Sequence, residues 1–175
     1  MYVSEAPEPY NNTSKEIFKD MPKIFLGGTI DMGNSENWQE LVIEHLKNYD
    51  NILVFNPRRG DWNPSWVQDP TPGTMFEEQV TWELETQEAS DIMIYNFEPN
   101  SKSPITMLEL GLFINSGKAI CVICNEQFYR YGNIKVVCDR YNVKIFPTLQ
   151  ESFKAIEEEL NIRTYKLGSV FKNEI

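Results

Sequence analysis

The chain has 175 residues, of which 41% are hydrophobic and 13% aromatic, and this composition is typical of one globular domain. Its 16 basic and 26 acidic residues give a formal net charge of −10, which argues against a nucleic-acid polymer or an anionic membrane surface as partner, because both require a basic face. The single histidine excludes a histidine-based metal cluster or catalytic triad.

The elements are expected in this order. Residues 1–20 are polar and contain prolines, which predicts a flexible N-terminal arm. A single domain is expected over residues 21–163, followed by a tail over 164–175. It begins with a strand over 23–26, a glycine turn over 27–31 and a helix from about residue 35. A second strand over 52–55 leads into a long loop over 56–73, and loops of that length are usually functional.

The second half of the chain repeats the alternation. Thr74 and Glu77 form a capping-box pattern that predicts a helix start, and this helix runs to about residue 89. A strand over 91–97 is followed by a helix that begins at Ser103 and Pro104 and ends before Gly117. Strands over 119–124 and 143–146 and a helix over 148–160 complete the domain. Cys121 and Cys124 lie in an apolar run and are expected to be buried thiols.

Strands that alternate with helices predict an α/β fold. The expected architecture is a flavodoxin-like, doubly wound, five-stranded parallel sheet in the order 2-1-3-4-5, with helices on both faces. Ligands in such sheets bind at the carboxyl ends of strands one and three, so the turn over 27–31, the loop over 56–73 and the segment over 98–109 should meet at one cleft. A phospho-receiver domain shares this order, but the strand over 91–97 ends without the required aspartate.

Glu109 is the one carboxylate in an otherwise almost wholly apolar helix, and no cation lies three or four residues away to pair with it. Burying an unpaired carboxylate is unfavourable by several kcal/mol, so its presence indicates a chemical task. A side chain whose tip reaches solvent is the alternative at this point.

Other polar and aromatic residues suit a ligand. Gly27, Gly28 and Thr29 would allow close approach of a ligand to the backbone, although an unliganded tight turn also uses glycine. The following loop carries planar groups suited to stacking on a nucleobase and hydrogen bonding to it, or it simply covers the end of the sheet. These groups are Arg58, Arg59, Asp61, Trp62 and Trp66.

Several segments together resemble the nucleoside 2-deoxyribosyltransferase family, including its nucleoside-monophosphate glycosidase branch. The resemblance covers about residues 22–160. It rests on residues 24–31, residues 55–59 with Asp61 and Trp62, residues 82–85 running to 89–91, residues 103–111, and residues 128–133.

The resemblance implies a role for each matching residue. Glu109 is expected to be the nucleophile that attacks C1′ of the sugar, and Glu83, an aspartate in typical members, to work with the leaving base. Ser103 is expected to meet the sugar 5′ end. Asn133 is expected to reach the active site of a neighbouring subunit, which implies a homo-oligomer with shared sites. The residues expected to bind substrate are Gly27, Gly28, Thr29, Asp31, Asn56, Arg58, Asp61, Trp62, Ser103 and Asn133.

The expected enzyme cleaves the N-glycosidic bond of a nucleoside or deoxynucleoside through a covalent glycosyl intermediate on Glu109 and transfers the sugar to another base. Alternatives are an N-glycoside hydrolase of nucleoside 5′-monophosphates or related nucleotides, and a non-catalytic nucleotide-binding or sensing module. Expected partners are a nucleoside or nucleotide and a free nucleobase, and no metal or other cofactor is expected. A cytoplasmic location is expected because the chain has no signal-peptide pattern. Phe25 stands where typical transferases carry a tyrosine hydroxyl next to the nucleophile.

Overall fold

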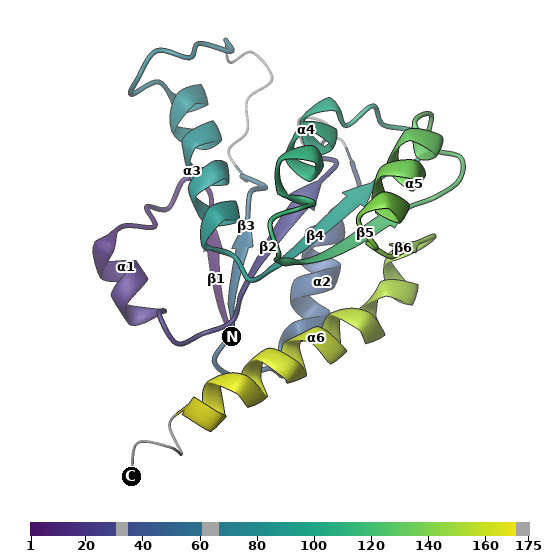
Figure 1. Ribbon diagram of the computed structural model, residues 1–175. Helices are drawn as coiled ribbons and strands as arrows, with labels where there is room; N and C mark the ends of the chain where they lie inside the picture. Colours follow the sequence, from purple (N-terminus) through teal and green to yellow (C-terminus); the bar gives the residue numbers. More distant parts are fainter. Residues whose placement is uncertain (31–34, 61–66, 171–175) are drawn as a thin grey trace.

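The computed structural model describes residues 1–30, 35–60 and 67–170 (Figure 1). Within these residues one parallel sheet contains six strands in the order β1-β3-β2-β4-β5-β6. The strands are β1 (Tyr2–Glu5), β2 (Lys23–Gly28), β3 (Leu53–Asn56), β4 (Ile92–Phe97), β5 (Ala119–Cys124) and β6 (Ile145–Phe146). The helices are α1 (Asn12–Ile17), α2 (Trp38–Leu46), α3 (Met75–Ala89), α4 (Pro104–Phe113), α5 (Tyr131–Arg140) and α6 (Leu149–Val170).

Helices cover both faces of the sheet, as predicted, and each face has its own apolar core (Figure 1). Trp82 of α3, Leu110 of α4 and Ile134 of α5 pack on one face. Val42 of α2 and Ile156 of α6 pack on the other. Because both faces are covered, the central strands β2, β3 and β4 are almost entirely buried and contain runs of apolar residues rather than an alternating pattern.

The prediction of five strands is wrong, because the N-terminal segment adds β1 at the edge of the sheet, beside β3. The five predicted strands keep their relative order, so the full order differs only by this addition. The sequence did not indicate β1 because only Ser4 of its four residues is buried, which leaves no apolar alternation to recognise.

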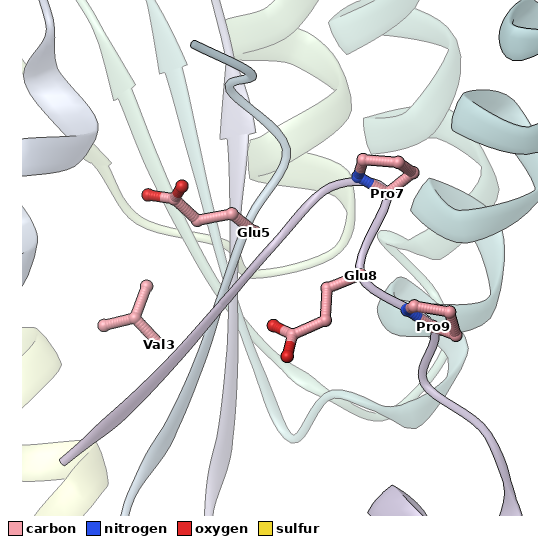
Figure 2. A pocket seen from close by; sticks show the side chains of 5 residues that line it. All are labelled: Val3, Glu5, Pro7, Glu8 and Pro9. Carbon is pink, nitrogen blue, oxygen red and sulfur yellow. The ribbon is translucent and has the colours of Figure 1, made fainter. Parts of the chain in front are cut away.

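The N-terminal segment is therefore not a loose arm. Tyr10 is buried, with its ring centroid 4.9 Å from that of Phe55. The indole nitrogen of Trp82 donates a 2.7 Å hydrogen bond to the carbonyl of Glu8. Beside β1 a surface cavity of about 590 Å³ is lined by Val3, Glu5, Pro7, Glu8 and Pro9, and the side chains of Val3 and Glu5 point to the same side of the strand (Figure 2). None of these lining residues is a predicted site residue.

Other boundaries differ in detail. Helix α5 was not predicted, and α6 continues to Val170, into the segment expected to be a tail. The capping box at α3 is confirmed: the side chain of Thr74 accepts a hydrogen bond from the backbone nitrogen of Glu77. Cys121 and Cys124 are buried free thiols in the two different cores, as residues three apart on a strand must be. Among the described residues, no helix is both long and apolar enough to cross a lipid bilayer.

Candidate active site

Helix α4 begins at Pro104, as predicted, and Ser103 occupies the N-cap position. Ser103 makes no side-chain capping bond, and its backbone is left-handed, with φ of 43°. Its hydroxyl instead lies 2.5 Å from the Thr29 hydroxyl and 2.9 Å from that of Ser101. This hydroxyl cluster joins the end of β2 to the start of the helix that carries Glu109.

Glu109 lies on the inner face of α4 and is only 8% exposed, so most of its side chain is removed from solvent. One oxygen of its carboxylate accepts a 2.8 Å hydrogen bond from Nε2 of Gln87, which is fully buried on α3. The oxygen of that amide accepts a 2.9 Å hydrogen bond from the hydroxyl of Tyr95 on β4. The nitrogen Nε2 also donates to the backbone carbonyl of Glu83, at 3.2 Å.

Glu83 is half-buried on α3, one turn before Gln87, and it influences the ionisation of Glu109. Burial and the nearby Glu83 carboxylate raise the pKa of Glu109 to about 8, and the hydrogen bond from Gln87 partly opposes that rise. Burial raises the pKa of Glu83 itself to about 7, opposed by a hydrogen bond from Gln79. Two such carboxyl groups titrate as a coupled pair, and loss of one proton leaves one anion and one acid. The higher pKa of Glu109 favours the remaining proton on Glu109, so a form with Glu109 ionised and Glu83 protonated is the less populated one.

Gln79 connects this pair to the loop after β3. Its Nε2 donates to the carboxylate of Glu83 at 2.7 Å and to the carbonyl of Pro57 at 3.1 Å. The loop that follows the second predicted strand is thus held against the carboxylate pair. This contact, with the one between Thr29 and Ser103, brings three of the predicted segments together at the carboxyl end of the sheet.

The two glycines of the β2 turn have a packing reason for being glycine. A Cβ atom on Gly27 would lie 2.7 Å from two ring carbons of Tyr95. A Cβ atom on Gly28 would lie 2.6 Å from the carbonyl oxygen of Asn96 and 2.7 Å from the ring of Trp38. Their lack of a side chain is therefore required by neighbours within the chain.

Only some of the predicted substrate-binding residues after β2 and β3 lie in the part of the chain that the structure describes. Asn56 is buried at the end of β3, and its side-chain oxygen accepts a hydrogen bond from the backbone nitrogen of Arg58. The guanidinium of Arg58 donates to the carbonyls of Ser35 and Glu36, at 3.0 and 3.1 Å, so it binds the segment before α2. The predicted residues Asp31, Asp61 and Trp62 lie outside the described residues.

Asn133 does not join this group. It lies in the first turn of α5 rather than on a loop, and its side chain is exposed. It stays a predicted contact to a neighbouring subunit.

Gln79, Gln87 and Tyr95 are the functional candidates that the sequence reasoning missed. Gln79, Glu83 and Gln87 are spaced four residues apart, so they form one stripe on the inward side of α3. The sequence did contain a signal for them: the polar stripe lies on the same side of the helix as Trp82 and Thr86, which are buried. Tyr95 had no such signal, because a tyrosine in a buried strand is usually part of the core.

Comparison with known proteins supports the resemblance. The sequence pattern of the family described as "Nucleoside 2-deoxyribosyltransferase like" matches residues 21–128. The chain belongs to this family. The match extends from the start of β2 through β4, α4 and β5, and so includes Glu83, Gln87, Tyr95 and Glu109.

The fold of this family member also occurs in a solved structure. A crystal structure of a conserved protein from Enterococcus faecalis V583 is similar, with a TM-score of 0.60 and 14% sequence identity. The similarity covers 80% of this chain and 99% of that one, and at this identity it shows the fold alone. No curated protein is detectably similar in sequence.

Proposed function

We propose that this family member is an enzyme that cleaves the N-glycosidic bond of a deoxynucleoside and transfers the sugar to another base. The observation that carries the proposal is the buried Glu109 carboxylate, which accepts a hydrogen bond from Gln87 and lies near a second carboxyl group, Glu83. Support comes from the position of this carboxyl pair near the carboxyl end of a parallel sheet, where ligands of such folds bind. The proposed reaction uses Glu109 as the anion and Glu83 as the acid.

The proposed reaction has two balanced steps. An oxygen of the Glu109 carboxylate attacks C1′ as the bond from C1′ to the base nitrogen breaks, and the base takes its electron pair and a proton from Glu83. In the second step a nitrogen of an acceptor base attacks C1′. The bond to Glu109 then breaks, its electron pair returns to the carboxylate, and the proton of the acceptor base goes to Glu83.

Hydrolysis of a nucleoside 5′-monophosphate is the second candidate. The observation that favours it is the hydroxyl cluster of Thr29, Ser101 and Ser103 at the start of α4, the positive end of the helix. Hydroxyl groups at such an end accommodate a phosphate, which a carboxylate there would repel. In this reaction water replaces the acceptor base in the second step.

Incubation with a deoxynucleoside and a free acceptor base, followed by chromatography, tests the proposal. The wild-type protein should form the new nucleoside, Glu109→Gln should not, and Glu85→Gln, an exposed residue on α3, should match the wild type. Free sugar without a new nucleoside supports hydrolysis, as does turnover of only the 5′-monophosphate. Base exchange by Glu109→Gln at the wild-type rate refutes the proposal, and nucleotide binding without any product supports a non-catalytic module.

The proposal includes self-association of the chain. The outward face of α4 is wholly apolar, and Ile105, Leu108 and Leu112 are 59%, 60% and 58% exposed. An exposed apolar patch of this kind marks an interaction surface. For a chain with a net charge of −10, an uncharged face is where a second copy can pack without like-charge repulsion. Because α4 carries Glu109 on its inner side, this contact would bring a neighbouring subunit close to the site.

A further inference from the structure

The side chain of Gln87 is fully buried, and every polar group on it is used. Its amide nitrogen donates to Glu109 and to the carbonyl of Glu83, and its amide oxygen accepts from Tyr95. A buried amide with all its hydrogen bonds formed is held in one place. The carboxylate that it contacts is thereby held in place as well.

Two neighbours besides Glu109 favour the observed direction of the amide: the backbone carbonyl of Glu83, which can only accept, and the Tyr95 hydroxyl, which donates. The two ends of an amide have nearly the same shape, so hydrogen-bond partners decide which end faces Glu109. With the amide turned over, its oxygen would face the carboxylate, and that arrangement is favourable only when Glu109 carries a proton to donate. By donating to the amide oxygen at 2.9 Å, Tyr95 favours the direction in which the NH₂ group faces Glu109.

The Tyr95 hydroxyl stays a hydrogen-bond donor at every pH at which Glu109 titrates. Burial and the nearby Glu109 carboxylate raise its pKa far above the ordinary value, so its hydroxyl keeps its proton. The only other acceptor recorded for this hydroxyl among the described residues is the sulfur of Met93, at 3.4 Å, which is a weak acceptor.

We propose that Tyr95 and Gln87 are positioning residues that together orient the Glu109 carboxylate and favour its ionised form. This inference rests on the proposed function only in taking Glu109 as the nucleophile. The hydroxyl that Phe25 lacks on β2 is then supplied from the neighbouring strand and acts through one intervening amide. Gly27 belongs to the same arrangement, because the Tyr95 ring occupies the space that a side chain at Gly27 would need.

The titratable groups that face Glu109 among the described residues are Glu83 from α3 and Tyr95 from β4. Glu83 opposes ionisation of Glu109 through its charge, and Gln87 favours it through its hydrogen bond. Removing the Tyr95 hydroxyl leaves the Glu83 charge unchanged. A change in the titration of Glu109 in that variant would therefore come from the changed orientation of the Gln87 amide.

The test is a pH titration by NMR of protein labelled with ¹³C at the glutamate carboxyl groups, in which the Glu109 signal is identified by its loss in Glu109→Gln. Tyr95→Phe should raise the titration midpoint of Glu109 by about half a pH unit, and Gln87→Met by about one or more, because a hydrogen bond to the anion is lost. Met93→Leu, which removes only the weak acceptor, is the matched control and should leave the midpoint unchanged. Circular dichroism checks that each variant is folded.

The outcome distinguishes this inference from the proposed function. A Glu109 midpoint in folded Tyr95→Phe and Gln87→Met that equals the wild-type value overturns the inference, whether or not the protein is active. If base exchange is observed, Tyr95→Phe should lower kcat about tenfold at neutral pH with little change in KM, and raising the pH should restore part of the loss. Absence of base exchange in the wild type, with the midpoint shifts present, rejects the proposed function and leaves the positioning of Glu109 intact.

Discussion

At the scale of single residues, the site depends on a carboxylate kept where ionisation is unfavourable. The sequence was sufficient to single out Glu109, because a lone acid in an apolar helix is conspicuous. It was not sufficient to find Gln87 and Tyr95, because an amide on a polar helix and a tyrosine in a strand each have an ordinary explanation. Their function depends on three elements that meet only in the folded chain.

Glu109 should lower the stability of the protein at high pH. Its pKa in the folded state, about 8, is above the ordinary value of 4.5, so the folded state binds the proton more tightly than the unfolded state. Stability therefore falls as the pH rises from about 4.5 to about 8, by about 4–5 kcal/mol. Glu109→Gln should raise Tm at pH 9 by about 10 °C and have little effect at pH 5.

Calorimetry at the two pH values, with Glu85→Gln as the exposed control, measures this difference. An equal effect of Glu109→Gln at both pH values would contradict the account of a buried carboxylate that resists ionisation.

Glu83 should set the pH range of catalysis. Activity requires Glu109 as anion and Glu83 as acid, so kcat/KM should rise with pH as Glu109 ionises and fall as the pair loses its last proton. Glu83→Gln removes the charge that raises the pKa of Glu109. In this variant the rising limb of the pH profile of kcat/KM should move to lower pH by on the order of one unit. The maximal rate should fall for bases that need a proton to leave. An unchanged rising limb would show that the two carboxyl groups do not interact.

At the scale of elements, glycines of the β2 turn hold the site through packing. The sequence interpretation of Gly27 and Gly28 as room for a ligand was reasonable for a glycine turn at the end of a strand. It could not foresee that the Tyr95 ring fills the space beside Gly27, since that requires the register between β2 and β4, in which Gly27 lies opposite Tyr95.

Gly27→Ala should therefore displace the Tyr95 ring, lower the free energy of unfolding by about 1–3 kcal/mol and reduce kcat in the way that Tyr95→Phe does. Gly111→Ala on α4 is the matched control. An added Cβ there has open space, and alanine favours a helix over glycine by about 1 kcal/mol, so this variant should be as stable as the wild type or more so. Chemical denaturation measures both, and equal stabilities of the two variants would contradict the packing argument.

At the scale of the whole molecule, the alternation of strands and helices predicted the parallel sheet and the relative order of five strands. The part it missed is the N-terminal strand, which is mostly exposed and is held beside β3 by backbone pairing rather than by a periodic apolar pattern. The topology of the sheet was enough to predict that the turn, the loop and α4 meet at one edge. It was not enough to predict which side chains form hydrogen bonds with Glu109 and Glu83.

The apolar face of α4 predicts an oligomer. Leu108→Lys should shift the protein toward monomers in sedimentation velocity, because it places a charge in the middle of that face. Leu41→Lys, at a 42% exposed leucine of α2 on the opposite side of the sheet, is the control and should sediment as the wild type does. A monomeric wild type would contradict this part of the proposal.

The central claim is that Glu109 forms a covalent bond to the sugar. The most direct measurement is the mass of the intact protein after rapid acid quenching in the presence of a deoxynucleoside, followed by peptide mapping. The account predicts a fraction of the protein heavier by one deoxyribosyl group, located on the peptide that contains Glu109 and absent in Glu109→Gln. An adduct on another residue, or turnover by Glu109→Gln at the wild-type rate, would contradict it.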